Sequence, residues 1–240
     1  MLKNKYLFTT LGQKISPPPG VTWTYQDDLS KSQTIFGTAN AQVIAWTGTQ
    51  FCVVGNLGRV ATSPDGITWT NRTGLSATAW GTTNAWAIAW TGTQFCVVGN
   101  SGRVATSPDG ITWTNQTGLS ATAWGTTTAG AIAWTGSQFC VVGNSGRVAT
   151  SPDGITWTNQ LGLSATAWGT ASARAVAWTG TQFCVVGNSG RVATSPDGIT
   201  WTNQTGLSAT AWGTTIAWAI AWTGSQFCAV GDLGRVATSP

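Results

Sequence analysis

The side chains that could do chemistry in this chain are few, and most of them recur at one fixed interval. All seven acidic residues are aspartates, and the chain contains neither glutamate nor histidine. Catalysis by a histidine base, a histidine-ligated metal and any glutamate acid or base are therefore excluded. The thiols lie 44 residues apart, at Cys52, Cys96, Cys140, Cys184 and Cys228.

A thiol can act as a nucleophile, a metal ligand or half of a disulfide, but the surroundings of these five favour none of those roles. Each cysteine follows a phenylalanine and lies in an apolar run such as Phe95-Cys96-Val97-Val98. Such a run is typical of a buried strand, in which cysteine behaves as a small hydrophobic residue. Five thiols also cannot all pair within one chain. We therefore expect buried, unpaired cysteines, no metal site and no cofactor.

The composition excludes some partners. Charged residues make up 8% of the chain, and its formal net charge of +4 comes from scattered lysines and arginines. No basic cluster with interleaved aromatic residues is present, which argues against nucleic acid as a partner. No apolar run approaches the roughly 20 residues that cross a bilayer, so we expect no membrane insertion. The first fifteen residues lack the apolar core of a secretory signal. The compartment stays open, with a virion or a cell surface as candidate settings.

The 44-residue interval extends along the whole chain and identifies the elements that carry these side chains. Within one period, residues 85–115 hold four short apolar runs at 85–90, 95–98, 103–107 and 111–115, separated by turn-forming residues. Repeats of 40–45 residues with four strands are typical of β-propeller blades. We therefore predict an all-β, five-bladed β-propeller with four-stranded antiparallel blades.

The two ends of the chain are predicted to share one blade. The last repeat stops at Ser239-Pro240, where the other repeats continue into Asp-Gly-Ile-Thr-Trp-Thr. Residues 20–24 supply a similar segment, Gly20-Val21-Thr22-Trp23-Thr24. Pairing of the N-terminal and C-terminal strands would close the ring without an open sheet edge. We assign residues 20–240 to the propeller and residues 1–19 to an N-terminal arm.

The turn before the fourth strand resembles a known motif. Its copies read Ser-Pro-Asp-Gly-Ile-Thr-Trp and begin at Ser63, Ser107, Ser151 and Ser195. They resemble the Asp-box of sialidase-type propellers, with one residue fewer. With the preceding Phe-Cys-Val-Val-Gly-Asn-Ser-Gly-Arg-Val-Ala-Thr-Ser, the repeat is more similar to the propellers of photosystem II assembly factors and many bacterial proteins. The resemblance implies a propeller over residues 20–240. A sialidase would also need a Tyr–Glu nucleophile pair, and without glutamate we expect no enzyme activity.

Two sets of repeated residues leave alternatives open. The arginines after the turn between the second and third strands either hydrogen-bond loop carbonyls, which we favour, or ring one face as an anion site; they are Arg59, Arg103, Arg147, Arg191 and Arg235. The linker tryptophans either pack between blades or face a groove; they are Trp80, Trp124, Trp168 and Trp212, with Phe36 in the equivalent place. The tryptophans of the innermost strands and of the hairpins are expected to lie in the core.

The positions that differ between near-identical repeats are informative, because each blade serves as a control for the next. The first variable position holds Asn40, Asn84, Thr128, Ser172 and Ile216. The second, two residues later, holds Gln42, Trp86, Gly130, Arg174 and Trp218. A third, milder position holds Leu57, Ser101, Ser145, Ser189 and Leu233. A four-stranded meander places all three at the same end of the blades, opposite the aspartate turns. An extended chain would point the first two positions the same way.

Binding residues commonly lie on loops at one face of a rigid scaffold, so we predict non-catalytic recognition through this face. The predicted ligand-binding residues are Asn40, Gln42, Asn84, Trp86, Thr128, Ser172, Arg174, Ile216 and Trp218. Tryptophans with hydroxyl and amide neighbours suit a glycan or a cell-surface receptor, as in a phage tail protein. The alternatives are an assembly or spacer protein attached to a larger particle through residues 1–19, neutral drift at exposed positions, and a consensus-like repeat without an evolved ligand.

Overall fold

The computed structural model describes residue 36 and residues 39–239, apart from residues 76, 77, 79, 120, 121, 123, 167, 208, 209 and 211. The innermost strands are β1 (Ala41–Trp46), β5 (Ala85–Trp90), β9 (Ala129–Trp134), β13 (Ala173–Trp178) and β17 (Ala217–Trp222). The second strands are β2 (Phe51–Gly55), β6 (Phe95–Gly99), β10 (Phe139–Gly143), β14 (Phe183–Gly187) and β18 (Phe227–Gly231).

The third strands are β3 (Val60–Ser63), β7 (Val104–Ser107), β11 (Val148–Ser151), β15 (Val192–Ser195) and β19 (Val236–Ser239). The fourth strands are β4 (Thr70–Arg72), β8 (Thr114–Gln116), β12 (Thr158–Gln160) and β16 (Thr202–Gln204). Short 3-10 turns join the second and third strands: η1 (Asn56–Gly58), η3 (Asn100–Gly102), η5 (Asn144–Gly146), η7 (Asn188–Gly190) and η9 (Asp232–Gly234). A further one, η6 (Leu163–Ala165), lies in a linker.

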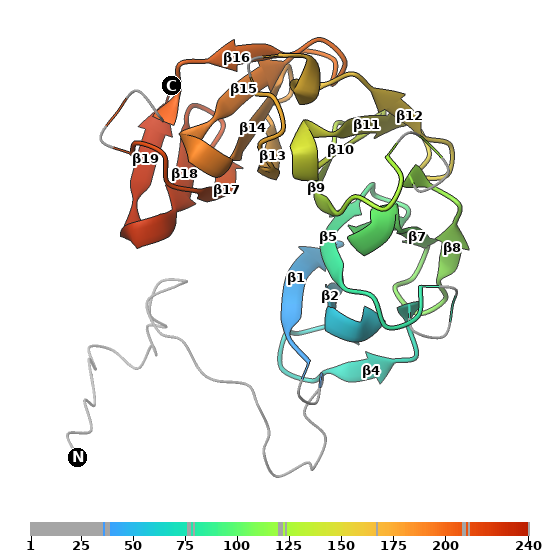
Figure 1. The fold of residues 1–240 in the computed structure, drawn as a ribbon. Helices are drawn as coiled ribbons and strands as arrows, with labels where there is room; N and C mark the ends of the chain where they lie inside the picture. Colours follow the sequence, from blue (N-terminus) through green and yellow to red (C-terminus); the bar gives the residue numbers. More distant parts are fainter. Residues whose placement is uncertain are drawn as a thin grey trace, which may run out of the picture.

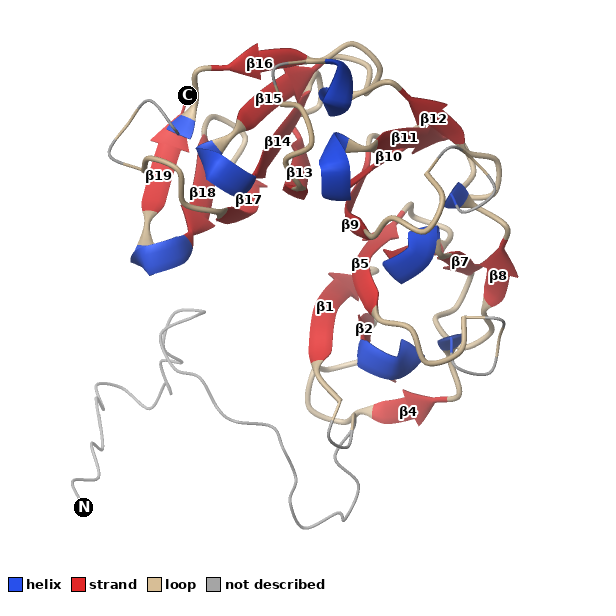
Figure 2. Ribbon diagram, viewed as in Figure 1, coloured by secondary structure: helices blue, strands red, loops and turns tan. Residues whose placement is uncertain are grey.

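These strands form the five blades of a β-propeller, each an antiparallel meander in chain order, as predicted. The blades follow one another along an arc with the innermost strands on its concave side (Figure 1), and short 3-10 turns are the helical elements of the described chain (Figure 2). The fifth blade has three described strands, β17, β18 and β19. Its expected fourth strand, residues 20–24, and the expected arm, residues 1–19, lie outside the described residues.

The predicted start of the fourth strand was wrong by three residues. The sequence suggested 111–115 in the second blade, but β8 begins at Thr114. The cause is the aspartate turn, where the Asp109 carboxylate accepts the backbone N–H groups of Ile111 and Thr112, both at 2.8 Å. These N–H groups are held by the turn and cannot join the β-ladder.

The core lies between neighbouring blades and is built largely from the second strands. Cys52 and Val54 of one blade pack in one cluster with Phe95 and Val97 of the next. The prediction of buried, unpaired thiols is confirmed for four cysteines, and Cys228 in the last blade is half-buried and also unpaired. Burial raises the pKa of Cys52 to about 12, although the nearby Arg72 opposes the shift, so this thiol is not a nucleophile at neutral pH.

At each of the first three junctions, the aspartate turn of one blade packs against the preceding blade. Gln50 Nε2 donates to the Asp109 carbonyl oxygen at 2.9 Å, across a sequence separation of 59 residues. A Cβ atom built on Gly110 would lie 3.2 Å from Thr62 Cγ2 and 3.4 Å from Cys52 Sγ. The turn therefore seats its glycine against the second and third strands of its neighbour.

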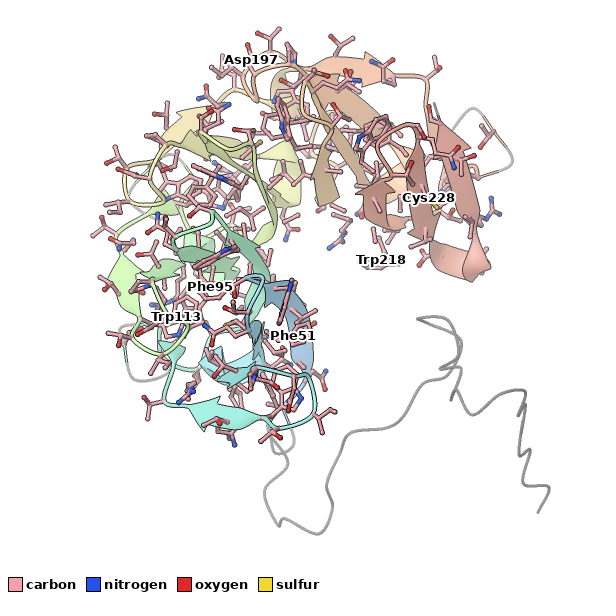
Figure 3. All side chains as sticks on the ribbon, turned by 180° about the vertical axis from the view of Figure 1, so that it is seen from behind. Phe51, Phe95, Trp113, Asp197, Trp218 and Cys228 are labelled. Carbon is pink, nitrogen blue, oxygen red and sulfur yellow. The ribbon has the colours of Figure 1, made fainter. Side chains whose placement is uncertain are left out.

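The aromatic residues divide differently from the prediction. The linker tryptophans are buried, so they pack in the core and do not face a groove; Phe36, in the equivalent place, is buried as well. These tryptophans are Trp80, Trp124, Trp168 and Trp212. The innermost-strand tryptophans, expected in the core, lie at its margin: Trp90, Trp134 and Trp178 are half-buried and pack against core clusters, whereas Trp46 is 47% exposed. Each lies at the end of its strand, close to a phenylalanine of the same blade, and in the first four blades a hairpin tryptophan also lies near that phenylalanine. Phe95, for example, lies 4.5 Å from Trp90 and 6.2 Å from Trp113, ring centre to ring centre. Phe95 and Trp113 are labelled in Figure 3.

Candidate functional site

The structure brings the three variable positions together at one end of the blades. In the first blade, the Asn40 carbonyl oxygen accepts the backbone N–H of Asn56, the first residue of η1, at 2.9 Å. The adjacent Leu57 donates its backbone N–H to Asn84 Oδ1 of the second blade at 3.3 Å. The turn of one blade thus meets the first variable position of its own blade and of the next. We call this end of the blades the variable face.

The second variable position is the site of a β-bulge in every blade. The pairing of β5 with β6 runs Ala87 to Val98 and then Ala85 to Gly99, so Trp86 is the extra residue. The same shift occurs at Gln42, Gly130, Arg174 and Trp218. A bulge redirects its side chain and is frequent beside functional sites. The expected simple alternation between the first and second variable positions therefore does not apply.

Each bulge side chain with a donor group bonds to one acceptor that hardly changes. Gln42 Nε2 donates to Asn56 Oδ1 at 2.8 Å, and Arg174 Nε donates to Asn188 Oδ1 at 2.8 Å. The indole N–H groups make the equivalent bonds, from Trp86 to Asn100 Oδ1 and from Trp218 to Asp232 Oδ1. A single carboxamide or carboxylate oxygen, 14 residues downstream, thus orients three different types of side chain.

The third blade is the exception, because Gly130 offers no donor to Asn144. A Cβ atom built on Gly130 would come no closer than 3.5 Å to another atom, the Ala173 carbonyl oxygen. The position therefore has room for a side chain, and glycine there is not imposed by packing. In the order of the blades, Gly130 thus lies between the bulge residue Trp86 of the second blade and the bulge residue Arg174 of the fourth blade.

Two bulge side chains stack on each other across a blade junction. Arg174 Cζ of β13 lies 4.9 Å from the Trp218 ring centre of β17. Trp218 is 47% exposed and lies on the concave side of the arc (Figure 3). A guanidinium over an indole is a favourable cation–π contact. With Trp86, these residues are of the types that dominate binding energies at protein interfaces.

The residues at the first variable position contribute mainly through the backbone. The Ser172 and Ile216 carbonyl oxygens each accept the N–H of the turn residue 16 positions later, at 3.0 Å. Thr128 Oγ1 additionally donates to Asn100 Oδ1 of the preceding blade at 3.3 Å. The predicted site is thus a set of neighbouring blade ends, in which the bulge residues carry the larger exposed groups.

The third variable position has left-handed backbone geometry. Its φ angles lie between 58° and 60° in all five turns. Glycine and asparagine favour this region, whereas leucine is disfavoured there. Leu57 and Leu233 nevertheless occupy it and are 44% and 81% exposed. Backbone strain of this kind clusters at functional sites.

Charge is separated between the two ends of the blades. The variable face carries Arg174 and the five arginines that follow the η turns, against the single acid Asp232 among the described residues. The opposite end carries the turn aspartates, Asp65, Asp109, Asp153 and Asp197. Partial desolvation raises the pKa of Asp109, but hydrogen bonds from the Thr112 and Ile111 N–H groups outweigh it and lower the pKa overall. These carboxylates are therefore charged at neutral pH.

Sequence reasoning missed the acceptor residues because they barely vary. Asn56, Asn100, Asn144 and Asn188 are identical, and the last repeat alone differs, with Asp232. The available signal was the constant spacing of 14 residues between the second variable position and these acceptors. Within the described chain, no group of three or more cysteines or aspartates is placed to hold a metal, and no helix has the length and apolarity to span a membrane.

No protein-family model and no curated protein matches this chain. Solved structures match its fold. YCF48 from Cyanidioschyzon merolae is 16% identical with a TM-score of 0.64, over 84% of this chain and 67% of that one. A structure of YCF48 bound to D1 peptide is 17% identical with a TM-score of 0.59, over 80% and 61%. Virginiamycin B lyase from Staphylococcus aureus is 8% identical with a TM-score of 0.61, over 84% and 70%.

These likenesses support a β-propeller repeat and show the fold alone, because all the identities are low. The chain spans about 61% of the length of the peptide-bound YCF48. One matching structure is named for a bound peptide and another is a lyase, so the fold by itself does not decide between binding and catalysis.

Proposed function

We propose that this chain is a non-catalytic docking module of the Asp-box propeller type, and that its variable face binds an acidic segment of a protein partner. The observation that carries the proposal is the bulge position. It is one of the two most varied positions of near-identical repeats, yet its donor side chains, from Gln42 to Trp218, all bond to the equivalent acceptor 14 residues later. The scaffold therefore holds exchangeable side chains in a fixed place at a solvent-facing rim.

The chemistry of the face favours a protein segment with negative charge. Trp86, Arg174 and Trp218 offer large, partly exposed surfaces of the kind that anchor peptides. The arginines after the η turns give this end an excess of positive charge, which steers acidic groups toward it. The named D1 peptide complex of YCF48 is a precedent for peptide binding by this fold. The absence of histidine and glutamate and the suppressed reactivity of the buried thiols support a non-catalytic role.

A displayed library of random 12-residue peptides tests the proposal. Peptides selected on the native chain should be enriched in aspartate and glutamate. Their affinity should fall roughly 30-fold or more in a Trp86→Ala, Arg174→Ala, Trp218→Ala triple variant, the loss expected for hot-spot residues. The matched control is Ile111→Ala, Ile155→Ala, Ile199→Ala, which removes exposed side chains from the opposite end. Equal loss in both triple variants, or none in the first, would refute the assignment.

A glycan is the second candidate ligand, and the half-exposed Trp218 favours it, because sugar C–H faces stack on indole rings. A glycan array separates the two candidates. Sugar binding that disappears in the Trp86→Ala, Trp218→Ala double variant would replace the peptide by a glycan at the same face. Sugar binding that survives the double variant would contradict a sugar site at these residues.

A further inference from the structure

Asn144, the first residue of η5, differs from the other acceptors that orient bulge side chains. These acceptors are the first residues of the five η turns: Asn56, Asn100, Asn144, Asn188 and Asp232. All except Asn144 accept the bulge donor of their own blade, and Asn100 Oδ1 also accepts Thr128 Oγ1. Ser172, the equivalent of Thr128 one blade further on, makes no such bond to Asn144. Within the described chain, the Asn144 side chain therefore has no hydrogen-bond partner.

The surroundings of Gly130 favour a donor group over an acceptor. A Cβ atom built on Gly130 would have the Ala173 and Val142 carbonyl oxygens as its nearest neighbours, at 3.5 and 3.9 Å. The half-buried Asn144 adds a side-chain oxygen at the place that bulge donors reach in the other four blades. An acceptor partly withheld from water is stabilised by a donor, and carbonyl oxygens repel a carboxylate. An N–H group therefore suits this position.

The bulge side chains lean toward the next blade along the arc. The Cβ direction of Gly130 meets Ala173 of the fourth blade, and Arg174 Cζ lies 4.9 Å from the Trp218 ring centre in the fifth. Trp86 has the same repeat position in β5, which lies beside β9 (Figure 1), so its indole leans toward Gly130. Glycine gives this indole no side chain to stack on, and among the described residues no other ring or cation stacks on it. A planar group above Gly130 would fill that place.

We propose that Gly130 and Asn144 form an anchor site on the variable face, which takes one planar N–H donor side chain of the bound segment: a guanidinium, an indole or a carboxamide. The group donates to Asn144 Oδ1 and stacks on Trp86. All three groups fit, because the arginine, tryptophan and glutamine bulge residues make the equivalent bond within the chain. The partner thus supplies, in the third blade, the side chain that glycine lacks. The inference rests on the proposed function for the source of this group, a protein segment.

Gly130→Gln is the decisive variant, because it supplies the donor from within the chain, as Gln42 does in the first blade. The φ angle of Gly130 lies outside the left-handed range, and the added Cβ meets no atom closer than 3.5 Å, so the variant should fold. The matched control is Ile155→Gln. It places the same side chain in the aspartate turn at the opposite end of the third blade, where Ile155 is 51% exposed.

Small probes test the anchor site without any peptide. Indole and methylguanidinium, which only donate, are titrated at millimolar concentration into the isotope-labelled full chain and followed by NMR. Each should shift the side-chain amide resonances of Asn144 more than those of Asn100, in the native chain and in Ile155→Gln. Gly130→Gln should abolish the difference. Acetate, which only accepts, should leave Asn144 unshifted.

Three results of the titration would overturn the proposal. They are the absence of a shift at Asn144, an equal shift at Asn100, and an acetate shift as large as the indole shift. A shift at Asn144 that persists in Gly130→Gln would also overturn it, because the probe would then bind elsewhere.

Peptides selected on the native chain connect the anchor site to the proposed function. Each should contain one arginine, tryptophan or glutamine whose replacement by alanine weakens binding roughly tenfold, both to the native chain and to Ile155→Gln. The same replacement should weaken binding to Gly130→Gln less than about twofold, because the chain's own glutamine already occupies the site.

The anchor site and the proposed function fail in different ways. An equal loss in all three chains would overturn the anchor site, while acidic enrichment of the peptides would still support the proposed function. Probe shifts at Asn144 without any selected peptide would support the donor site and refute a protein segment as its partner.

Discussion

A Gly→Ala substitution in the aspartate turns measures how much each turn contributes to the junction with the preceding blade. Gly110 and Gly66 occupy the same turn position and have almost the same backbone, with φ of 72° and 74°. A Cβ on either would meet a phenylalanine of its own blade at 3.3 Å. Only the Cβ on Gly110 would also meet another blade, through Thr62 and Cys52.

The expected magnitudes follow from these contacts. Alanine at a left-handed position costs roughly 1–2 kcal/mol, and both variants bear this cost. Crowding of the added methyl group against a packed neighbouring blade costs roughly a further 1–3 kcal/mol in Gly110→Ala alone. Gly110→Ala should therefore lower the free energy of unfolding by about 2–5 kcal/mol, and Gly66→Ala by about 1–2 kcal/mol.

Urea unfolding at equilibrium, followed by tryptophan fluorescence and circular dichroism, gives both values. Gly92→Ala, at a position of φ 102° with no atom within 4 Å of the added Cβ, reports backbone strain without contacts. Losses in Gly110→Ala and Gly66→Ala that agree within about 0.5 kcal/mol, the limit for independent effects, would refute the inter-blade socket.

Three further outcomes are expected. Leu233→Asn should raise the free energy of unfolding by roughly 0.5–1 kcal/mol in urea denaturation, because the strained leucine is 81% exposed and buries little; a loss of stability would show that Leu233 packs in the fold. The lowered pKa of Asp109 means that its folded carboxyl binds a proton less readily than the unfolded one, so its contribution is complete above the ordinary carboxyl pKa of 3.8 and is lost as the pH falls through the folded value. Thermal melts between pH 7 and pH 2 should therefore show a smaller acid-induced loss in Asp109→Asn. A double-mutant cycle on Arg174 and Trp218 should give a coupling energy of about 0.5–1 kcal/mol, as for a partly exposed cation–π pair; a coupling of zero would contradict the stacking.

The fold was predictable because its main signal, the 44-residue period, does not depend on packing details. Four apolar runs bounded by turn residues in each period were enough to predict a four-stranded blade. The order of those strands was enough to predict the end of the blades at which the variable residues gather. The beginning of β8 was not predictable from the apolar pattern, because the Asp109 side chain takes the N–H groups of two residues that otherwise resemble a strand.

The candidate site was predictable in position but not in construction. Variation between repeats located the bulge residues, yet an alternating pattern carries no mark of the extra residue at Trp86. The acceptors escaped notice for the opposite reason, since Asn100 and its equivalents are constant and variation was the signal followed. The stacking of Arg174 on Trp218 needed three-dimensional structure, because it joins two blades.

The near-identity of the blade junctions has a consequence for how the chain finds its structure. Gln50 bonds to Asp109 in the turn of the next blade, 59 residues away along the chain. The turn of the blade after that is chemically identical and lies a further 44 residues along the chain, so Gln50 could pair with it instead. Loop-closure entropy separates these two choices by only about 0.5 kcal/mol. Correct neighbours are therefore selected by the short linkers and by the order in which blades form. We expect refolding from denaturant to pass through mispaired, slowly rearranging states, as is common for tandem repeats.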